Sequence, residues 1–368
     1  MSGNLVGERF ILMTFGESHG KVVGAVLDGC PAGLALSESD IQAELDLRKP
    51  GQSIVTTTRR EEDRVEIMSG VFNGMTTGAP IMMMIRNEDK DPRAYEAIKA
   101  TPRPGHADFV ASRKYGGFND YRGGGRFSGR ITASFVMGGA IAKKLLREAL
   151  GVEIVAYSLE IGGVVAEGFD FEQAKANRYS NEVRAPTASA AEEMKRKIIE
   201  VRGKGNSLGG VVECVATNLP VGLGEPVFAS LDSDLARIVL SIPAVKGVEF
   251  GSGFSSARST GLENNDEFAF EGQKVVTRSN NAGGILGGLS NGMPLLYRVA
   301  FKPASSIASK QSTVDLTSGK EAELVVPGRH DPTVVPRAVP VVESVTALTL
   351  ADHAMRAGLI PPVIGRSG

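Results

Sequence analysis

Cysteine is scarce in this 368-residue sequence, and so are patterns that bind metals. The only two cysteines, Cys30 and Cys214, lie far apart and outside any CxxC spacing, which argues against a disulfide framework or a zinc–cysteine cluster. No HxxxH or HExxH spacing occurs, so we expect no metal site. Free thiols favour a reducing compartment, and we therefore predict a cytoplasmic protein.

Long apolar runs and an excess of one charge are also missing. The densest apolar run, PIMMMI at 80–85, is typical of a buried strand and too short to span a membrane. The first ten residues, MSGNLVGERF, lack the pattern of a secretory signal. With 41 basic and 42 acidic residues the net charge is −1, so bulk electrostatics attracts neither nucleic acid nor a membrane surface. We expect neither as a partner.

Strand-like and helix-like segments alternate along the chain, which predicts a fold of mixed α+β (α/β-type) class. Strands are expected over 9–16, 21–29 and 152–166, and a helix from about 128 to 150. Residues 24–45 and 211–239 share a plan of strand, Pro-x-Gly-Leu turn and helix. This predicts two pseudo-repeated halves packed as one body, although chance recurrence of such pieces explains the pattern equally well.

Positive charge is concentrated between Arg103 and Arg130. These 28 residues contain five arginines, one lysine and seven glycines against two acids, a local charge of +4. Glycines let the backbone approach a ligand and guanidinium groups pair with phosphate or carboxylate, so the stretch predicts an anion site. Within it RGGGRFSGR could instead belong to an RNA-binding protein or a small-molecule kinase. Such an RNA-binding segment is normally repeated, and the Walker lysine of a kinase is absent.

Three of the four histidines lie in loops rich in glycine, proline or charge: His19 in GESHG, His106 in RPGHAD and His330 in GRHDP. A histidine near a phosphate is a natural proton donor, because its pKa lies close to neutral pH. Each could equally make only local hydrogen bonds. His353 lies in a helix-like segment, where we expect a structural role.

Several basic residues outside that stretch also lie in loops: Arg48, Lys49, Arg59, Arg60, Lys302 and Arg329. Such residues are commonly solvated surface, but their concentration near glycine and proline predicts that several converge on one polyanion.

The blocks TFGESHG, RPGHAD, RGGGRFSGRITA, IPAVKGVEFGSGF, NNAGGILGGLSNGMP, FKPASSI and GRHDPTVVPRAVPVVE follow one another along almost the whole chain. In this order they resemble the chorismate synthase family. The resemblance implies a single domain over 1–368, a β-α-β sandwich and a homotetramer. It also implies an anti 1,4-elimination of phosphate from 5-enolpyruvylshikimate 3-phosphate that gives chorismate and requires reduced FMN.

Roles for five residues follow from the same resemblance. It implies that His19 protonates the leaving phosphate, with Ser18 and Ser128 as relay hydroxyls. It implies that His106 protonates the reduced flavin and that Asp331 acts with the flavin in removing the C6 hydrogen.

The resemblance implies binding residues as well. Flavin contacts are expected from Arg126, Phe127, Ser128, Pro243, Ala244, Gly287, Lys302, Pro303, Ala304, Ser305, Ser306 and Arg329. The substrate's phosphate and two carboxylates are expected to meet Arg48, Arg59, Arg60, Arg130 and Arg329.

Some positions depart from the family pattern. Ile54 replaces a usual arginine, which weakens an NADP(H) contact there, and Phe127, Gly129 and Ile131 replace a usual serine, alanine and glutamate. The loop at 116–121 is one residue longer than usual. No GxGxxG-plus-acid dinucleotide fingerprint is evident, so we expect an external flavin reductase or reductant.

Overall fold

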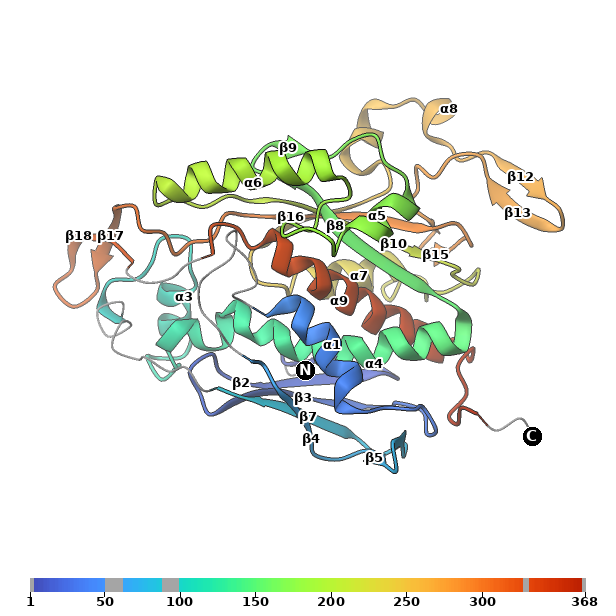
Figure 1. Ribbon diagram of the computed structural model, residues 1–368, viewed down its shortest axis with the longest axis horizontal. Helices are drawn as coiled ribbons and strands as arrows, with labels where there is room; N and C mark the ends of the chain where they lie inside the picture. Colours follow the sequence, from blue (N-terminus) through green and yellow to red (C-terminus); the bar gives the residue numbers. More distant parts are fainter. Residues whose placement is uncertain (1–2, 50–61, 88–98, 327–330, 366–368) are drawn as a thin grey trace.

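The computed structural model describes residues 3–49, 62–87, 99–326 and 331–365. Two five-stranded sheets enclose a layer of helices (Figure 1). The first sheet has the order β1-β2-β3-β7-β4, with β1 (Leu5–Val6), β2 (Ile11–Gly16), β3 (Val22–Asp28), β4 (Val65–Ile67) and β7 (Ile81–Arg86). The second has the order β11-β16-β10-β8-β9, with β8 (Glu153–Ile161), β9 (Val164–Val165), β10 (Gly210–Thr217), β11 (Val245–Phe250) and β16 (Leu295–Phe301).

Every strand pair in the two sheets is antiparallel. In β7 the side chains of Ile81, Met83 and Ile85 are buried, whereas those between them are more exposed. This alternation is expected of a strand with one face on the core. The apolar run at 80–85 is therefore a strand, as predicted.

Helices α1 (Glu38–Arg48), α4 (Thr132–Leu150), α7 (Leu231–Val239) and α9 (Val335–Arg356) lie between the sheets (Figure 1). The shorter helix α5 (Phe171–Asn177) and helix α6 (Ala188–Gly203) lie on the outer side of the second sheet (Figure 1). Along α9 almost every residue is buried, as expected of a helix at the centre of a protein.

Two glycines in α4 allow close packing between the layers. A Cβ on Gly138 would lie 2.6 Å from Cδ1 of Leu12 in β2, and one on Gly139 would lie 2.2 Å from Cβ of Ser344 in α9. Glycine destabilises the interior of a helix by about 0.5–1 kcal/mol. Here the missing side chains let α4 pack closely against both β2 and α9.

Helix α4 begins at Thr132, later than the predicted start near residue 128. Two short 3-10 turns, Arg122–Phe127 and Gly129–Ile131, precede it. Gly123, Gly124 and Gly125 have φ values of +60°, +86° and +52°, which an α-helix cannot accommodate. The glycine-rich segment is therefore a folded loop before the helix.

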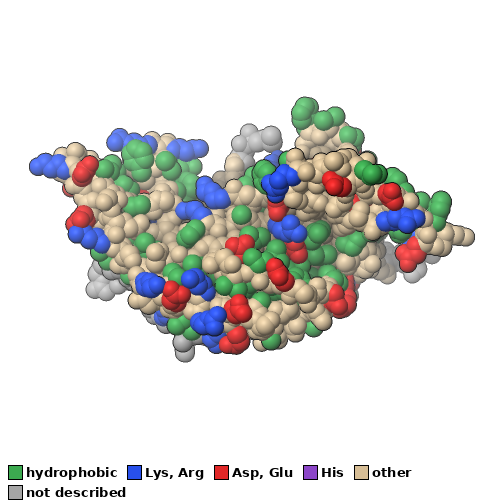
Figure 2. Space-filling view, turned by 90° about the horizontal axis from the view of Figure 1, so that it is seen from above, with side chains coloured by type: hydrophobic (Ala, Val, Ile, Leu, Met, Phe, Trp, Pro, Cys, Tyr) green, Lys and Arg blue, Asp and Glu red, His purple; other side chains and the backbone are tan. Residues whose placement is uncertain are grey.

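Smaller elements extend from this body. They are α3 (Asp108–Lys114), α8 (Gly261–Asn264) and the two-stranded pairs β5 (Val71–Phe72) with β6 (Met75–Thr76), β12 (Phe268–Glu271) with β13 (Lys274–Thr277), β14 (Ile285–Leu286) with β15 (Leu289–Ser290), and β17 (Gln311–Asp315) with β18 (Lys320–Leu324). Acidic and basic side chains are interspersed over the face in Figure 2. Among the described residues, no helix has the length and apolarity needed to cross a membrane. The mixture of helices and antiparallel strands agrees with the predicted α+β class.

Candidate active site

A cavity of about 600 Å³ collects loops from distant parts of the sequence. It is lined by the turn after β2, the 103–107 segment, the glycine-rich loop, residues 240–246 and 301–306, and the start of α9. Among the residues that the structure describes, five arginines and two lysines line it against one carboxylate, that of Asp331. Such an excess of positive charge in an enclosed space attracts anions.

His19 and Ser18 are buried at this cavity, with 4% and 3% of their surfaces exposed. Nδ1 of His19 lies 3.2 Å from Oγ of Ser18. The glycine-rich loop packs directly against them, because a Cβ on Gly123 would lie 2.1 Å from Nδ1 of His19 and 2.9 Å from Oγ of Ser18. Only glycine allows this approach, and the positive φ of Gly123 requires it as well.

His106 lies on the other side of the same glycines. A Cβ on Gly124 would come within 3.0 Å of Nε2 of His106. Nδ1 of His106 lies 2.6 Å from Oδ1 of Asp108, whose second oxygen accepts a 2.7 Å hydrogen bond from Nε of Arg103. Burial opposes ionisation of Asp108, but the hydrogen bonds from Arg103 and His106 outweigh it and hold the pKa of this carboxyl well below its usual range.

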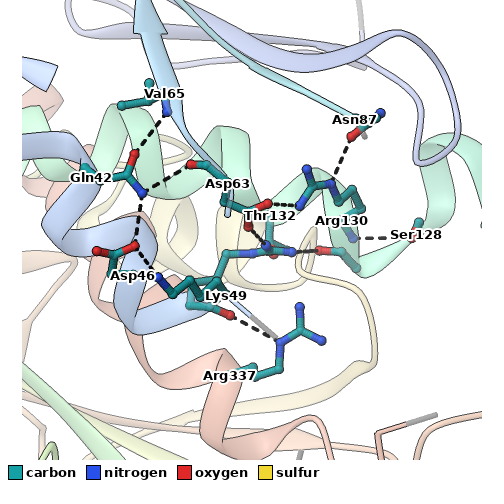
Figure 3. Close-up of polar contacts among 12 residues, drawn as sticks. Gln42, Asp46, Lys49, Asp63, Val65, Asn87, Ser128, Arg130, Thr132 and Arg337 are labelled. Atoms are coloured by element: carbon teal, nitrogen blue, oxygen red, sulfur yellow. Dashed lines mark hydrogen bonds and ion pairs between the residues drawn. The ribbon is translucent and has the colours of Figure 1, made fainter. Parts of the chain in front are cut away.

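Asp63 joins two arginines of the cavity (Figure 3). Its fully buried carboxylate accepts a 3.0 Å hydrogen bond from Nη1 of Arg48 and another from Nη1 of Arg130. Arg48 also donates from Nε to Oγ1 of Thr132 at 3.0 Å and from Nη2 to the carbonyl of Gly129 at 2.9 Å. Nε of Arg130 donates to Oδ1 of Asn87 at 3.1 Å. These contacts fix both guanidinium groups relative to α1 and to the start of α4.

Asp331 contacts an arginine in the first turn of α9. Nη1 of Arg337 donates to Oδ2 of Asp331 at 2.5 Å, and Nε of Arg337 donates to the backbone carbonyl of Arg48 at 3.2 Å. The end of α1 and the start of α9 are thus tied beside the cavity.

Lys302 anchors the segment after β16 to the loop that carries His106. Its Nζ donates to the carbonyl of Gly105 at 2.5 Å and contacts Oγ of Ser305 at 2.7 Å. Burial, together with the nearby Lys246, lowers the pKa of Lys302. Ala244 has a φ of +74°, a strained conformation of the kind found at functional sites, and its carbonyl accepts a hydrogen bond from the backbone of Lys302.

Arg126 holds the glycine-rich loop to β2. Its guanidinium donates to the carbonyl of Gly16 at 3.0 Å, to Oγ1 of Thr14 at 2.7 Å and to Oδ1 of Asn4 at 2.8 Å. Burial lowers the pKa of Arg126. The next side chain, Phe127, is 38% exposed at the cavity.

Most of the predicted site residues meet at this cavity. They are Ser18, His19, Arg48, His106, Arg126, Phe127, Ser128, Arg130, Pro243, Ala244, Lys302, Pro303, Ala304, Ser305, Ser306 and Asp331. Gly287 does not line the cavity and lies between β14 and β15. The predictions for Ile54, Arg59, Arg60, Arg329 and His330 concern residues outside the described ranges. His353 does not line the cavity either, and its Nε2 lies 3.1 Å from Oδ2 of Asp234.

No individual role was predicted for Asp63, Arg103, Asp108 or Arg337, although Arg103 and Asp108 lie in the stretch predicted to bind an anion. Three of the four stand in family motifs, Arg103 and Asp108 in RPGHAD and Arg337 in the PRAVPVVE segment. The spacing His-x-Asp could have suggested a carboxylate partner for His106. Nothing in the sequence distinguishes Asp63 from the neighbouring acids. Within the described ranges, no group of three or more His, Cys, Asp or Glu side chains could hold a metal ion.

Comparisons with known proteins agree on one family. The family model for chorismate synthase matches residues 10–355. A chorismate synthase of Korarchaeum cryptofilum is 57% identical over 356 residues, which cover 97% of this chain and 98% of the relative. One of Dehalococcoides mccartyi is 53% identical over 361 residues, covering 98% and 99%. One of Methanosarcina mazei is 52% identical over 362 residues, again covering 98% and 99%.

The fold is similar to that of a solved structure described as a crystal structure of chorismate synthase. The TM-score is 0.75 at 34% sequence identity, and the match covers 95% of this chain and 93% of the other.

Proposed function

This chain belongs to the chorismate synthase family, and we propose that it converts 5-enolpyruvylshikimate 3-phosphate to chorismate and phosphate with the help of reduced FMN. Family membership makes it a lyase of the shikimate pathway. The basic cavity carries the finer proposal, because two buried or half-buried histidines, a carboxylate and seven cationic side chains meet there among the described residues.

The charge of the substrate suits this cavity. The reaction breaks a C–O bond to phosphate and a C–H bond at C6, and it causes no net oxidation or reduction. A phosphate dianion is a poor leaving group, so a proton donor and nearby cations speed its departure. Two carboxylates add further negative charge to the same molecule. Arg48 and Arg130, held rigid by Asp63, supply preorganised cations for these anionic groups.

The cavity is also suited to FMN. Its volume lies within the usual range for ligand pockets, and its walls combine apolar groups such as Ile242, Val245 and Phe301 with Lys302. When bound, reduced FMN supplies electron density for the loss of phosphate and a nitrogen for the removal of the C6 hydrogen. Residues 126–128, 243–244 and 302–306 are the proposed contacts, with Gly287 and Arg329 further candidates.

We assign roles to the polar side chains as follows. His19 donates a proton to the departing phosphate, and Ser18, 3.2 Å from its Nδ1, relays protons with Ser128. His106 holds a proton beside the flavin. Asp331, oriented by Arg337, takes part in removing the C6 hydrogen. Close contact of the glycine-rich loop with both histidines supports one shared reaction space.

The remaining proposals concern the whole protein. We propose a cytoplasmic homotetramer that receives reduced FMN from an external reductase or another reductant. Large apolar side chains are exposed on the segment carrying α8 and the β12–β13 pair, with Leu262 85% and Phe270 81% exposed. Exposed apolar surface of this kind is typical of a site where proteins bind one another, which supports contact between subunits here.

We also propose that the molecule consists of two pseudo-repeated halves. The order β2-β3-β7-β4 in one sheet corresponds to β8-β10-β16-β11 in the other. In chain order, each half has a central strand (β3 or β10), a helix (α1 or α7), an edge strand (β4 or β11) and its neighbour (β7 or β16) before a long helix (α4 or α9). Superposition of the two halves would test this correspondence, and a failure of the paired strands and helices to align would refute it.

The test of the reaction is an anaerobic assay of phosphate release from 5-enolpyruvylshikimate 3-phosphate. We expect release with chemically reduced FMN and none without flavin. Release at full rate without flavin would refute the cofactor requirement. A parallel reaction with NADPH and oxidised FMN tests the reductant. Chorismate formed there would show a built-in reductase activity and overturn the need for an external one.

A further inference from the structure

We propose that Asp108 is a positioning residue that fixes the tautomer of His106, so that Nδ1 carries a hydrogen and Nε2 is the atom that gains and loses a proton. The geometry of this pair does not depend on the reaction, whereas its consequence for catalysis rests on the proposed function.

The contact between the two side chains determines which nitrogen carries the hydrogen. Nδ1 of His106 and Oδ1 of Asp108 are 2.6 Å apart. An ionised carboxylate can only accept, so Nδ1 must be the donor. Asp108 remains ionised over the working range because its pKa is held well below normal, mainly by Arg103 and His106 acting against burial. Whenever the imidazole of His106 is neutral, its hydrogen is therefore on Nδ1.

Arg103 holds Asp108 in place. Its backbone N–H and its Nε both donate to Oδ2 of Asp108, at 3.1 and 2.7 Å, and its Nη2 donates to Oδ1 at 2.8 Å. Its Nη1 donates to Oγ of Ser306 at 3.0 Å, which ties this group to the segment after β16. Only 6% of the Arg103 side chain and 10% of the Asp108 side chain are exposed.

The other edge of the imidazole is left for proton exchange. Nη2 of Arg103 lies 3.1 Å from Nδ1 and 3.3 Å from Nε2, so this guanidinium rests against the ring between its two nitrogens and does not close off Nε2. Gly124 leaves room at this edge, since a Cβ there would lie 2.8 Å from Cε1. The charged groups around the ring oppose one another. Asp108 places a negative charge beside Nδ1, whereas Arg103, and Lys302 at the carbonyl of Gly105, place positive charges nearby.

This arrangement resembles the use of a buried carboxylate to orient a catalytic histidine in other enzymes, where loss of the carboxylate leaves the ring in the wrong tautomer. The imidazole then keeps its place in the site, but its hydrogen is on the wrong nitrogen. Loss of Asp108 should consequently impair turnover more than substrate binding.

The direct test is long-range ¹H–¹⁵N NMR of the full chain labelled at histidine, without flavin or substrate. The resonances of His106 are identified by their loss in His106→Gln. We expect neutral His106 in the wild type to show a protonated Nδ1 and an unprotonated Nε2. In Asp108→Ala the Nδ1 resonance should move toward that of an unprotonated nitrogen. A wild-type spectrum with the hydrogen on Nε2 would overturn the proposal without any variant.

Asp266→Ala is the matched control, because Asp266 also holds a loop by three hydrogen bonds, from Ser279 Oγ and the backbone of Asn281 and Ala282, but does not line the cavity. It should leave the His106 resonances unchanged. If both variants shift them equally, the effect is general loop disturbance and the proposal fails.

A second experiment measures the rate of chorismate formation as a function of pH, with reduced FMN supplied. In Asp108→Ala we expect kcat to fall by about 100-fold, KM to change much less, and the alkaline limb of the pH profile to move to lower pH, since the imidazolium has lost its carboxylate partner. An unchanged profile would refute the catalytic consequence. Absence of chorismate formation in the wild type would refute the proposed function and leave the NMR result standing.

Discussion

Gly123 determines how closely the glycine-rich loop can approach His19. In Gly123→Ala the new Cβ would overlap the imidazole at 2.1 Å, and alanine at a φ of +60° costs roughly 1–2 kcal/mol. Displacement of a proton donor by about 1 Å can cost on the order of 100-fold in rate. We therefore expect kcat to fall by at least about that factor in a steady-state phosphate-release assay.

Gly129→Ala provides the control in the same loop. A Cβ on Gly129 would have no heavy atom within 4 Å, and its φ is not in the left-handed region. This variant should fold normally and lose far less activity than Gly123→Ala. Equal activities in the two variants would contradict the role given to the close approach.

The buried carboxylate of Asp63 is expected to stabilise the folded protein. Asp63→Asn removes the negative charge between two buried arginines, and breaking such a buried pair costs about 3–5 kcal/mol. We expect a loss of that size in the free energy of unfolding measured in urea. Glu66→Gln, which removes an exposed partner of Arg86, should change it little. A loss in Asp63→Asn no larger than that of the control would show that the arginines do not need this carboxylate.

The sequence predicted single residues well where a family motif contains them and poorly where a contact joins distant segments. His19, His106 and Asp331 were predicted, and all three line the cavity. Asp63 was missed, because its importance arises only when Arg48 and Arg130, 82 positions apart in the sequence, meet at one carboxylate.

Helix α9 carries a buried charge at its centre. Glu343 accepts hydrogen bonds from Nζ of Lys143 at 2.8 Å, the backbone of Ala156 at 2.9 Å and Nε of Arg178 at 3.1 Å. Burial opposes ionisation of Glu343, yet Lys143 and Arg178 outweigh it and lower its pKa. The contacts join α9 to α4, to β8 and to the segment after α5.

Glu343→Gln should therefore destabilise the protein in a pH-dependent way. At neutral pH we expect a loss of about 3–5 kcal/mol, because Lys143 and Arg178 lose a buried partner. A lowered pKa in the folded state stabilises the protein above the unfolded value, about 4.3, and this stabilisation disappears as the pH falls further. Urea denaturation should show that the difference between wild type and variant shrinks below about pH 4.3.

An exposed glutamate serves as the comparison for this helix. Glu200→Gln in α6 removes a surface partner of Lys204 and should change stability little at either pH. A difference between wild type and Glu343→Gln that stays constant down to acid pH would contradict the assignment of an ionised Glu343.

At the scale of elements, the periodic segments were predictable and the loops were not. Strands β2 and β3 lie within the predicted ranges 9–16 and 21–29, since their alternating patterns reflect burial on one face. The start of α4 was predicted four residues too early, because Gly129–Ile131 form a 3-10 turn capped by Ser128, which periodicity cannot distinguish from the first turn of an α-helix.

For the whole molecule, the alternation of strand-like and helix-like segments predicted the mixed class. The meeting of five separate loops at one cavity could not be derived from periodicity. Segments around residues 18, 105, 125, 244 and 303 come together because the two sheets and the helices between them bring their ends to one place. Only the resemblance to a family connected these segments beforehand. The structure brings most of the family motifs of this chain together around one cavity.

The central claim is that this cavity performs an elimination that needs reduced flavin but does not consume it. The most direct test is one anaerobic reaction with substrate in large excess over reduced FMN, in which chorismate, phosphate and the flavin absorbance are followed together. We predict equal amounts of chorismate and phosphate, many turnovers per flavin and no net flavin oxidation. One flavin oxidised per product formed, or phosphate released without chorismate, would contradict the account.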